Sequence, residues 1–555
     1  MNLRSSILRI LMKAFLSEDA MSSDLVGSLL QKCMKLKSLQ QGKQIHAQLL
    51  TRGVDITTGS LNSKLVGVYA GCGDVQSARL IFENIRRPSV FGWNWMISAL
   101  AFQGHSEDAV RYFSHMQEAG ILPNKFTSSS VLKACVGLMD INMGKELHCI
   151  INRMGFESDV QVANALIDMY CKCGKLDSAR QLFDRMPKRD IASWTSMICG
   201  YSRGGKLKQS LILFEQMKLE DLEPNDFTWN AIIAGYAQNG DCDRAFELFS
   251  KMRKERSVPD LVTWNAMITG YVQNHQNLKA IELFKDMLVS GLKPNSVTIA
   301  SLLPAFGLIG SLHRGKQVHC LIIRLGLSIN IFVSTALIDM YSKCGSVKYA
   351  WNVFDQFATK NVASWNAIIG CYGKHGLVDT SIQLFGRMQE EGVWANQVTF
   401  TCLLSACSHG GLVKKGLEIF KSIKEISGTE VSKEHYACTV DLLCRSGKLE
   451  EAYELIKDMP VDVNDSIVGA FLNGCRMHGR NDLAKKMVQE ILEMEKPGGF
   501  VTLSNIFAAD GEWTGVENVR KVMKEKNIFK KPGCSWVEKK DLFVGFKVGE
   551  TVVEA

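Results

Sequence analysis

The feature that most constrains the fold is an internal repeat. DFTWNAIIAGYAQNG begins at Asp226, and the closely similar LVTWNAMITGYVQNH begins 35 residues later at Leu261. The intervals Trp93–Trp194 and Trp264–Trp365 are both 101 residues long, which fits two units of 35 residues and one of 31. A fixed period of this size predicts a solenoid of stacked units, none of which can bury its apolar face alone.

Each unit has the pattern of two helices. In the unit that starts at Asp226, apolar residues recur at the spacing of one helical face: Trp229, Ile232, Ile233 and Tyr236. Asn239-Gly240-Asp241 then interrupts the helix, and Asp241 can cap the next one. A second apolar stripe follows: Ala245, Leu248, Phe249 and Met252. The sequence therefore predicts an all-α fold of helical hairpins that stack into a superhelix with a concave groove.

Composition excludes several classes of protein. The chain is 46% hydrophobic and 22% charged, which is typical of a folded protein and not of a disordered one. No run of 18 apolar residues occurs, so we expect no membrane-spanning helix. The formal charge of +8 is compatible with a polyanionic partner.

The cysteines do not have the spacing of a metal site. Their number, 17, is odd, and Cys72, Cys173 and Cys344 occupy equivalent turns, which predicts small apolar packing residues in a reducing compartment. The absence of any C-x-x-C pair argues against structural zinc.

The first residues, MNLRSSILRILMKAFLSEDA, differ in character from the repeats. Arg4, Arg9 and Lys13 precede the first acidic residue, Glu18, and the apolar residues lie along one helical face. A basic, amphipathic, acid-free start predicts an organelle transit peptide over 1–22, directed to the mitochondrion more than to the chloroplast. An ordinary capping helix is the alternative.

The repeats resemble a known family. Units of 35 residues with W-N-A-I-I-x-G-Y, interleaved with units of 31 and 35–36, are similar to those of plant PLS-class pentatricopeptide repeat proteins, whereas the W-x-x-L-G-x-x-Y pattern of tetratricopeptide repeats is absent. The resemblance implies a right-handed superhelical solenoid of helix-turn-helix repeats. We assign thirteen units to residues 23–464, starting near Ser23, Gly59, Val90, Lys125, Val160, Ile191, Asp226, Leu261, Ser296, Ile331, Val362, Gln397 and Lys433.

The resemblance extends into the tail. Trp513, Asn518-Val519-Arg520 and Gly533-Cys534-Ser535-Trp536 resemble the E motifs that follow the last repeat in RNA-editing members of the family. We therefore assign residues 465–539 to E-type motifs and 540–555 to a short degenerate tail.

The sequence gives no sign of catalytic chemistry of its own. Some relatives continue into a DYW-type deaminase domain, in which an H-x-E and a C-x-x-C group hold zinc. The one H-x-E here, His105-Ser106-Glu107, opens the second helix of a repeat and has no C-x-x-C partner, so polar residues at a helix start explain it better. No phosphate-binding loop or catalytic triad spacing is found. We expect a protein that is not an enzyme and has no cofactor, metal, membrane or small-molecule partner.

The fifth residue of each unit is polar and short in almost every repeat. It follows a position on the apolar stripe, so it lies about 100° away from the buried face. A role in stability alone predicts varied surface residues there, including Lys and Glu. A restricted set predicts hydrogen bonding to a ligand with donor and acceptor edges, such as a nucleic-acid base. The set is Asn94, Ser129, Asn164, Thr195, Asn230, Asn265, Thr335, Asn366 and Thr401.

The family resemblance implies that each repeat binds one base of single-stranded RNA, through the fifth residue and the last residue of the unit. The last residues are all Asn or Asp: Asn124, Asp159, Asp190, Asn225, Asp260, Asn295, Asn330, Asn361 and Asn396. These types also end helical hairpins well, which explains the last position in part. The apolar second residues Phe91, Phe227, Val262 and Val398 resemble the family's base-flanking wedge, with packing at the helix start as the alternative.

Three functions remain open at this point. The first is a site-recognition factor for C-to-U RNA editing that recruits a DYW-type deaminase or other editing factors in trans. The second is an organellar factor for RNA splicing or stability. The third is a protein-binding scaffold. The interleaved unit lengths and the E motifs favour the first, and the Asn/Thr–Asn/Asp pairs favour RNA over a protein ligand.

Overall fold

A computed structural model describes most of the chain after the first 22 residues. The described residues are 23–54, 61–255, 258–328, 330–356, 360–427, 430–461, 463–487, 497–528, 534–539, 542–547 and 553–554. The predicted transit peptide lies outside them, as does half of the predicted tail over 540–555.

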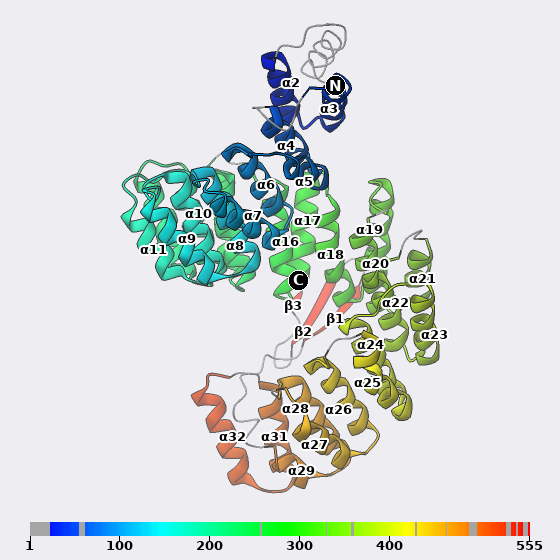
Figure 1. Cartoon of the computed structure of the whole chain (residues 1–555). Helices are drawn as coiled ribbons and strands as arrows, with labels where there is room; N and C mark the ends of the chain where they lie inside the picture. The colour runs from blue at the N-terminus through cyan, green and yellow to red at the C-terminus, as the bar shows by residue number, and fades with distance from the viewer. Residues whose placement is uncertain are drawn as a thin grey trace. The chain divides into compact units, whose positions relative to one another are not determined.

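The chain divides into two compact units, Met1–Met267 and Ile268–Ala555, with the division inside helix α16 (Figure 1). The first unit contains α2 (Ser23–Leu36), α3 (Leu39–Thr51), α4 (Leu61–Gly71), α5 (Val75–Glu83), α6 (Val90–Phe102), α7 (Ser106–Glu118), α8 (Lys125–Leu138), α9 (Ile141–Arg153), α10 (Val160–Lys172), α11 (Leu176–Arg185), α12 (Ile191–Arg203), α13 (Leu207–Leu219), α14 (Asp226–Gln238), α15 (Cys242–Lys254) and the start of α16 (Leu261–Gln273).

The second unit continues the helical pattern and ends in strands. It contains the rest of α16, then α17 (Asn277–Val289), α18 (Ser296–Ile309), α19 (Leu312–Arg324), α20 (Ile331–Lys343), α21 (Val347–Asp355), α22 (Val362–Lys374), α23 (Val378–Glu390), α24 (Gln397–Gly410), α25 (Val413–Ser427), α26 (Lys433–Arg445), α27 (Leu449–Asp458), α28 (Asp465–Met477), α29 (Asn481–Lys485), α31 (Pro497–Ala509), α32 (Trp513–Glu525), β1 (Cys534–Lys539), β2 (Leu542–Lys547) and β3 (Val553–Glu554).

The helical-repeat fold is confirmed. A helix begins at every predicted unit start except Gly59, which lies outside the described residues. The break predicted within the unit that starts at Asp226 is also present: Gly240 has a φ of 94°, and the Asp241 side chain accepts a hydrogen bond from the Arg244 backbone N–H at the start of α15. Glycine adopts this left-handed conformation without the steric cost that a Cβ brings.

Aromatic contacts join one hairpin to the next. Trp229 of α14 is buried and meets Phe214 of α13 edge-to-face, with ring centroids 4.7 Å apart. The same contact joins Phe249 to Trp264 at 4.9 Å. Such pairs stabilise a protein by about 0.5–1.5 kcal/mol beyond the area they bury. The second helix of one repeat thereby packs on the first helix of the next, which fixes the first helices as neighbours.

The last repeat and the E-type region share one apolar core. Leu443 of α26, Phe471 of α28 and Phe500 of α31 belong to a single cluster of buried residues that also includes Val519 of α32. Beyond it, β1, β2 and β3 form an antiparallel sheet in that order, a feature that was not predicted from the sequence. Among the described residues no helix is long and apolar enough to cross a membrane, and the cysteines from Cys33 to Cys475 are free thiols.

Candidate nucleic-acid interface

We call the fifth and last residues of one unit a reading pair. In at least four units the structure joins the two side chains by a hydrogen bond from the fifth residue's Nδ2 to the last residue's Oδ1. The joined pairs and their distances are Asn94–Asn124 at 3.1 Å, Asn164–Asp190 at 3.1 Å, Asn230–Asp260 at 3.3 Å and Asn366–Asn396 at 3.0 Å. Residues 26 to 30 positions apart thus form one polar element in each of these units, half-buried in three of them and with Asn366 buried in the fourth.

The last residue of each joined pair is also the N-cap of the first helix of the following unit. Asn124 accepts hydrogen bonds from the backbone N–H groups of Phe126 and Thr127, and Asn396 accepts one from Thr399. The N-terminal turn of a helix leaves several N–H groups without partners, and Asn or Asp at the cap satisfies them. Asn and Asp at this position therefore have a structural cause as well, as the sequence suggested.

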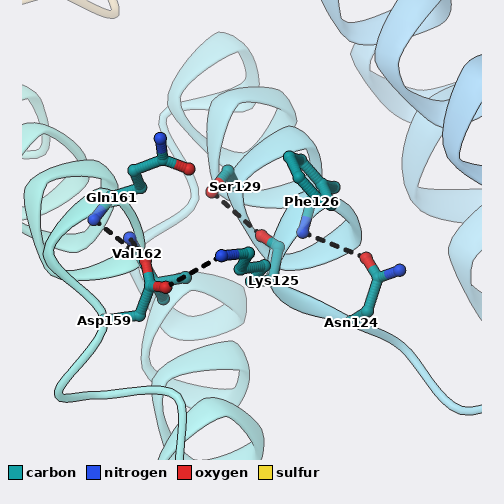
Figure 2. Close-up of polar contacts among 7 residues, drawn as sticks. All are labelled: Asn124, Lys125, Phe126, Ser129, Asp159, Gln161 and Val162. Carbon is teal, nitrogen blue, oxygen red and sulfur yellow. Dashed lines mark hydrogen bonds and ion pairs between the residues drawn. The ribbon is translucent and has the colours of Figure 1, made fainter.

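The Ser129 and Asp159 side chains are not joined, as Figure 2 shows. Ser129 donates its hydroxyl back to the Lys125 carbonyl at 3.0 Å, and Asp159 faces the Lys125 Nζ at 3.3 Å while it caps α10. This unit therefore differs from the four joined pairs, because the Lys125 Nζ contacts the Asp159 carboxylate and the Ser129 hydroxyl bonds to its own helix.

Units with threonine at the fifth position follow a different pattern. The Thr195 hydroxyl lies 2.7 Å from the Ile191 carbonyl and 2.7 Å from the Thr228 hydroxyl, which in turn donates to Asn225 at 2.9 Å. Thr228 thus bridges the two members of this reading pair.

The remaining threonine positions satisfy their own helices. Thr335 and Thr401 donate to the carbonyls four residues earlier in their helices. Asn361, the last residue paired with Thr335, caps α22.

The remaining predicted residues lie on or before α16, α18 and α20. Asn265 is buried on α16, Asn295 caps α18 through the Thr298 backbone N–H, and Asn330 caps α20. These residues stay predictions as RNA contacts.

The apolar second residues are exposed. Phe227 is 78% exposed and Val398 is 53% exposed, and Phe91 and Val262 lie between these values. Packing at the helix start therefore does not explain them. Large apolar side chains repeated at one exposed position are available to pack against a ligand.

Asp190 and Asp260 stay ionised in this environment. Burial raises the pKa of Asp190, but hydrogen bonds from the Ser193 backbone and hydroxyl and from Asn164 outweigh it and hold the pKa below its usual range. Burial likewise raises the pKa of Asp260, and hydrogen bonds from Thr263 and Asn230 outweigh it and lower that pKa. A carboxylate repels a phosphate but accepts a hydrogen bond from a base, so these positions suit base edges.

Basic residues lie near the reading pairs. Lys172, Arg203, Lys343 and Lys374 occupy the last turns of α10, α12, α20 and α22, eight residues after the fifth residue of each unit. Eight residues rise about 12 Å along a helix. This is longer than the distance over which a charge acts in physiological salt, about 8 Å. Lys172 and Lys343 are also paired with Asp168 and Asp339, each at 2.7 Å, so these cations act little on a ligand at the reading pairs themselves.

The structure adds to the site one position that was not predicted from the sequence. It is the third residue of the unit that follows a reading pair. The hydroxyls of Thr127, Thr263 and Thr399 contact the fifth-residue amides of the preceding units. The signal was present in the sequence, because KFT, LVT and QVT repeat a threonine at this position.

Within the described part of the chain no group of His, Cys, Asp or Glu could hold a metal ion. His105, the start of the H-x-E, is the N-cap residue of α7 and makes no side-chain cap hydrogen bond there. Its position at a helix start agrees with the interpretation of H-x-E as part of a repeat.

Comparison with known proteins places these features in a family. Residues 478–538 match the E motif. The PPR repeat family matches 88–137, 189–230, 259–307 and 360–409, further PPR repeats match 154–187, 332–362, 398–427 and 435–462, and the pentatricopeptide repeat domain matches 212–274.

Two relatives from Arabidopsis thaliana illustrate the similarity. A chloroplastic pentatricopeptide repeat-containing protein is 35% identical over 95% of this chain, and a putative mitochondrial one is 33% identical over 92%. This chain spans 53% of the first and 71% of the second. Among solved structures, maize PPR10 in complex with an 18-nt psaJ RNA element aligns at 17% identity and a TM-score of 0.45, covering 95% of this chain and 88% of that one.

The repeats, the E motif and the relatives agree. The chain belongs to the pentatricopeptide repeat family, as a plant PLS-class member of the E type.

Proposed function

We propose that the chain binds single-stranded RNA in a plant organelle, with one base at each reading pair. The observation that carries the proposal is the joined pair, in which an Asn amide meets an Asn or Asp oxygen in each of these four units; the amide is half-buried in three of them and buried at Asn366. An Asn amide can donate to one atom of a base edge and accept from another. Bases paired in a duplex do not offer these edges, which favours single strands.

The family code gives an order of bases. Asn/Asp pairs favour U, Thr/Asn pairs favour A, and Asn/Asn pairs favour a pyrimidine, with the amino end of the protein at the 5′ side of the RNA. From the Asn94–Asn124 pair onward the order is pyrimidine, a weakly bound base, U, A, U, pyrimidine, an unread base, A and pyrimidine. The family register then places two weakly bound bases and three free ones before the edited C.

We further propose that the protein selects sites for C-to-U editing and recruits a deaminase in trans. The E motif supports this proposal, because it resembles the region that follows the repeats in editing members. The relatives named as mitochondrial and chloroplastic support an organelle, and the basic start of the chain favours the mitochondrion over the chloroplast.

The test compares transcript cDNA with genomic DNA in a plant that lacks the protein. A C that is read as T in wild-type cDNA and stays C in the mutant supports editing. Unspliced or missing transcripts with complete editing would support the splicing or stability function instead. Complete editing together with normal transcripts would contradict both.

A further inference from the structure

Buried threonine hydroxyls reach back to three of the joined pairs. Thr127 Oγ1 lies 2.5 Å from Asn94 Oδ1, Thr263 Oγ1 lies 2.6 Å from Asn230 Oδ1, and Thr399 Oγ1 lies 2.7 Å from Asn366 Oδ1. All three threonines are fully buried. Each is the third residue of the unit that follows the pair, and lies 33 residues after the asparagine that it contacts.

The hydrogen of each hydroxyl has one preferred acceptor. A threonine hydroxyl carries a single hydrogen. The Thr263 hydroxyl is 2.6 Å from Asn230 Oδ1 and 2.9 Å from Asp260 Oδ1, so the shorter contact is the one to the asparagine. The hydroxyl of Thr399 also accepts the Asn396 backbone N–H at 3.0 Å. One of its two lone pairs is therefore used within the cap. Its hydrogen is directed at Asn366 Oδ1, which at 2.7 Å is nearer than Asn396 Oδ1 at 3.1 Å.

This contact fixes the orientation of the asparagine amide. Asn230 donates Nδ2–H to the Asp260 carboxylate, which can only accept, and accepts at Oδ1 from Thr263. Rotating the amide by 180° would bring two oxygens together and would separate Oδ1 from its donor. One N–H and one lone pair remain for a base, in a fixed order.

We propose that the third residue of the following unit is a positioning residue that sets base discrimination at the preceding reading pair. The proposal rests on the proposed function, in which the asparagine contacts the base. A fixed amide binds a base whose donor and acceptor occur in the matching order. An amide that can rotate also accepts a base with the opposite order, and discrimination falls.

A fourth pair provides a comparison within the same chain. Asn164–Asp190 has the same composition as Asn230–Asp260, but Ser193 stands at the third position of the next unit. The Ser193 hydroxyl donates to Asp190 at 2.8 Å, and Asn164 Oδ1 is buried with no hydrogen-bond donor among the described residues. The two Asn/Asp pairs should therefore differ in how sharply they distinguish U from C, with the Asn230 pair the sharper.

The experiment uses the full chain with Thr263→Val, which keeps the shape of the side chain and the backbone N–H cap bond to Asp260 but removes the hydroxyl. Binding is measured to four single-stranded RNAs of the proposed order that differ only at the base facing Asn230–Asp260. If Thr263→Val costs the equivalent of one net hydrogen bond, the preference of the variant for U over C should fall about three- to tenfold. Base preference at the Asn94–Asn124 position should stay unchanged. This serves as a folding control, because a general loss of folding would change the preference at both positions.

Ser364→Ala is the matched control. Ser364 is the third residue of its unit, as Thr263 is, and its backbone N–H donates to the capping residue Asn361 in the same way. Its hydroxyl, however, donates to the Asn361 carbonyl. This variant should leave base preference at the Thr335–Asn361 position unchanged. If Thr263→Val does not fold, Thr399→Val repeats the test at the Asn366–Asn396 pair, where the preference that should weaken is the one for a pyrimidine over a purine.

Asn230→Ala separates the two ways in which the proposal can fail. If Asn230→Ala loses the preference for U and Thr263→Val keeps it, the positioning role is wrong and base binding by Asn230 stands. If Asn230→Ala also keeps the preference, the pair does not contact that base, and the proposed function in this register fails together with the inference.

Discussion

Asp190→Asn should separate the two roles of the last residue. Asp190 Oδ1 accepts from the Ser193 backbone N–H at 2.8 Å, from the Ser193 hydroxyl at 2.8 Å and from Asn164 Nδ2 at 3.1 Å. An asparagine Oδ1 can accept the same three hydrogens, and Asn is about as good an N-cap as Asp. The start of α12 should therefore keep its stability.

Base preference should change although the helix does not. By the family code the pair becomes Asn/Asn, so the preference for U over C at this base should disappear. The loss of one hydrogen bond to the base is about 0.5–1.5 kcal/mol, or roughly a three- to tenfold change in the ratio of dissociation constants. Asp190→Ala is the contrast, because it also removes the cap at a cost of about 1 kcal/mol.

Hydrogen exchange of α12 and RNA binding measure the two roles separately. About 1 kcal/mol of lost cap stability corresponds to roughly fivefold faster exchange in the first turn of α12 in Asp190→Ala. Asp190→Asn should exchange like the unchanged protein. The reasoning is refuted if Asp190→Asn speeds exchange as much as Asp190→Ala, or if it retains the full preference for U.

Four further outcomes are expected. Thr195→Asn converts Thr/Asn to Asn/Asn, so binding to four RNAs that differ at that base should show the preference moving from A to pyrimidine; an unchanged preference for A would contradict the register. Affinity for RNA should fall steeply in a salt titration, because phosphate contacts release counterions. The protein alone should not convert C to U, and metal analysis should find no tightly bound zinc in it. Deletion of 466–555 uncovers the apolar face of the last repeat, so the soluble, folded fraction is used: its RNA affinity should be largely intact in a binding assay, and editing in plants should be abolished; lost binding by a truncated protein that stays folded would assign the region a role in RNA contact. Hydrogen bonds depress the pKa of Asp190, so the contribution of this carboxylate to stability is complete above about pH 3.9 and is lost as the pH falls further. Melting curves at a series of pH values check this. A loss of stability already at pH 6 would not come from Asp190.

The helical architecture could be predicted because its determinants are local. The apolar stripe around Trp229 and the break at Gly240 are patterns within one unit, and the structure reproduces both. The repetition of 35 residues then extends one unit to the array. The pairing of Phe214 with Trp229 follows from the same apolar faces.

The contacts between units were less predictable. Which reading pairs are joined depends on the partners that compete for each side chain, and Ser129 shows that a polar residue at the right position can bond to its own helix instead. The role of Thr263 depends on an approach between residues 33 positions apart that no local pattern specifies. The strands β1–β3 lie beyond the repeats, where the helical period gives no guidance.

The core shared by the last repeat and the E-type region limits how such proteins can be recombined. Leu443 and Phe471 lie in one buried cluster although the predicted boundary at residue 465 separates them. An E-type region transferred to another array would need a last repeat whose apolar face fits α28, and an array cut before α28 would expose that face to water. Terminal units of solenoids must present a polar outer surface to remain soluble. The E-type region therefore serves the array as its end cap, and a functional chimera should carry the last repeat and the E-type region together.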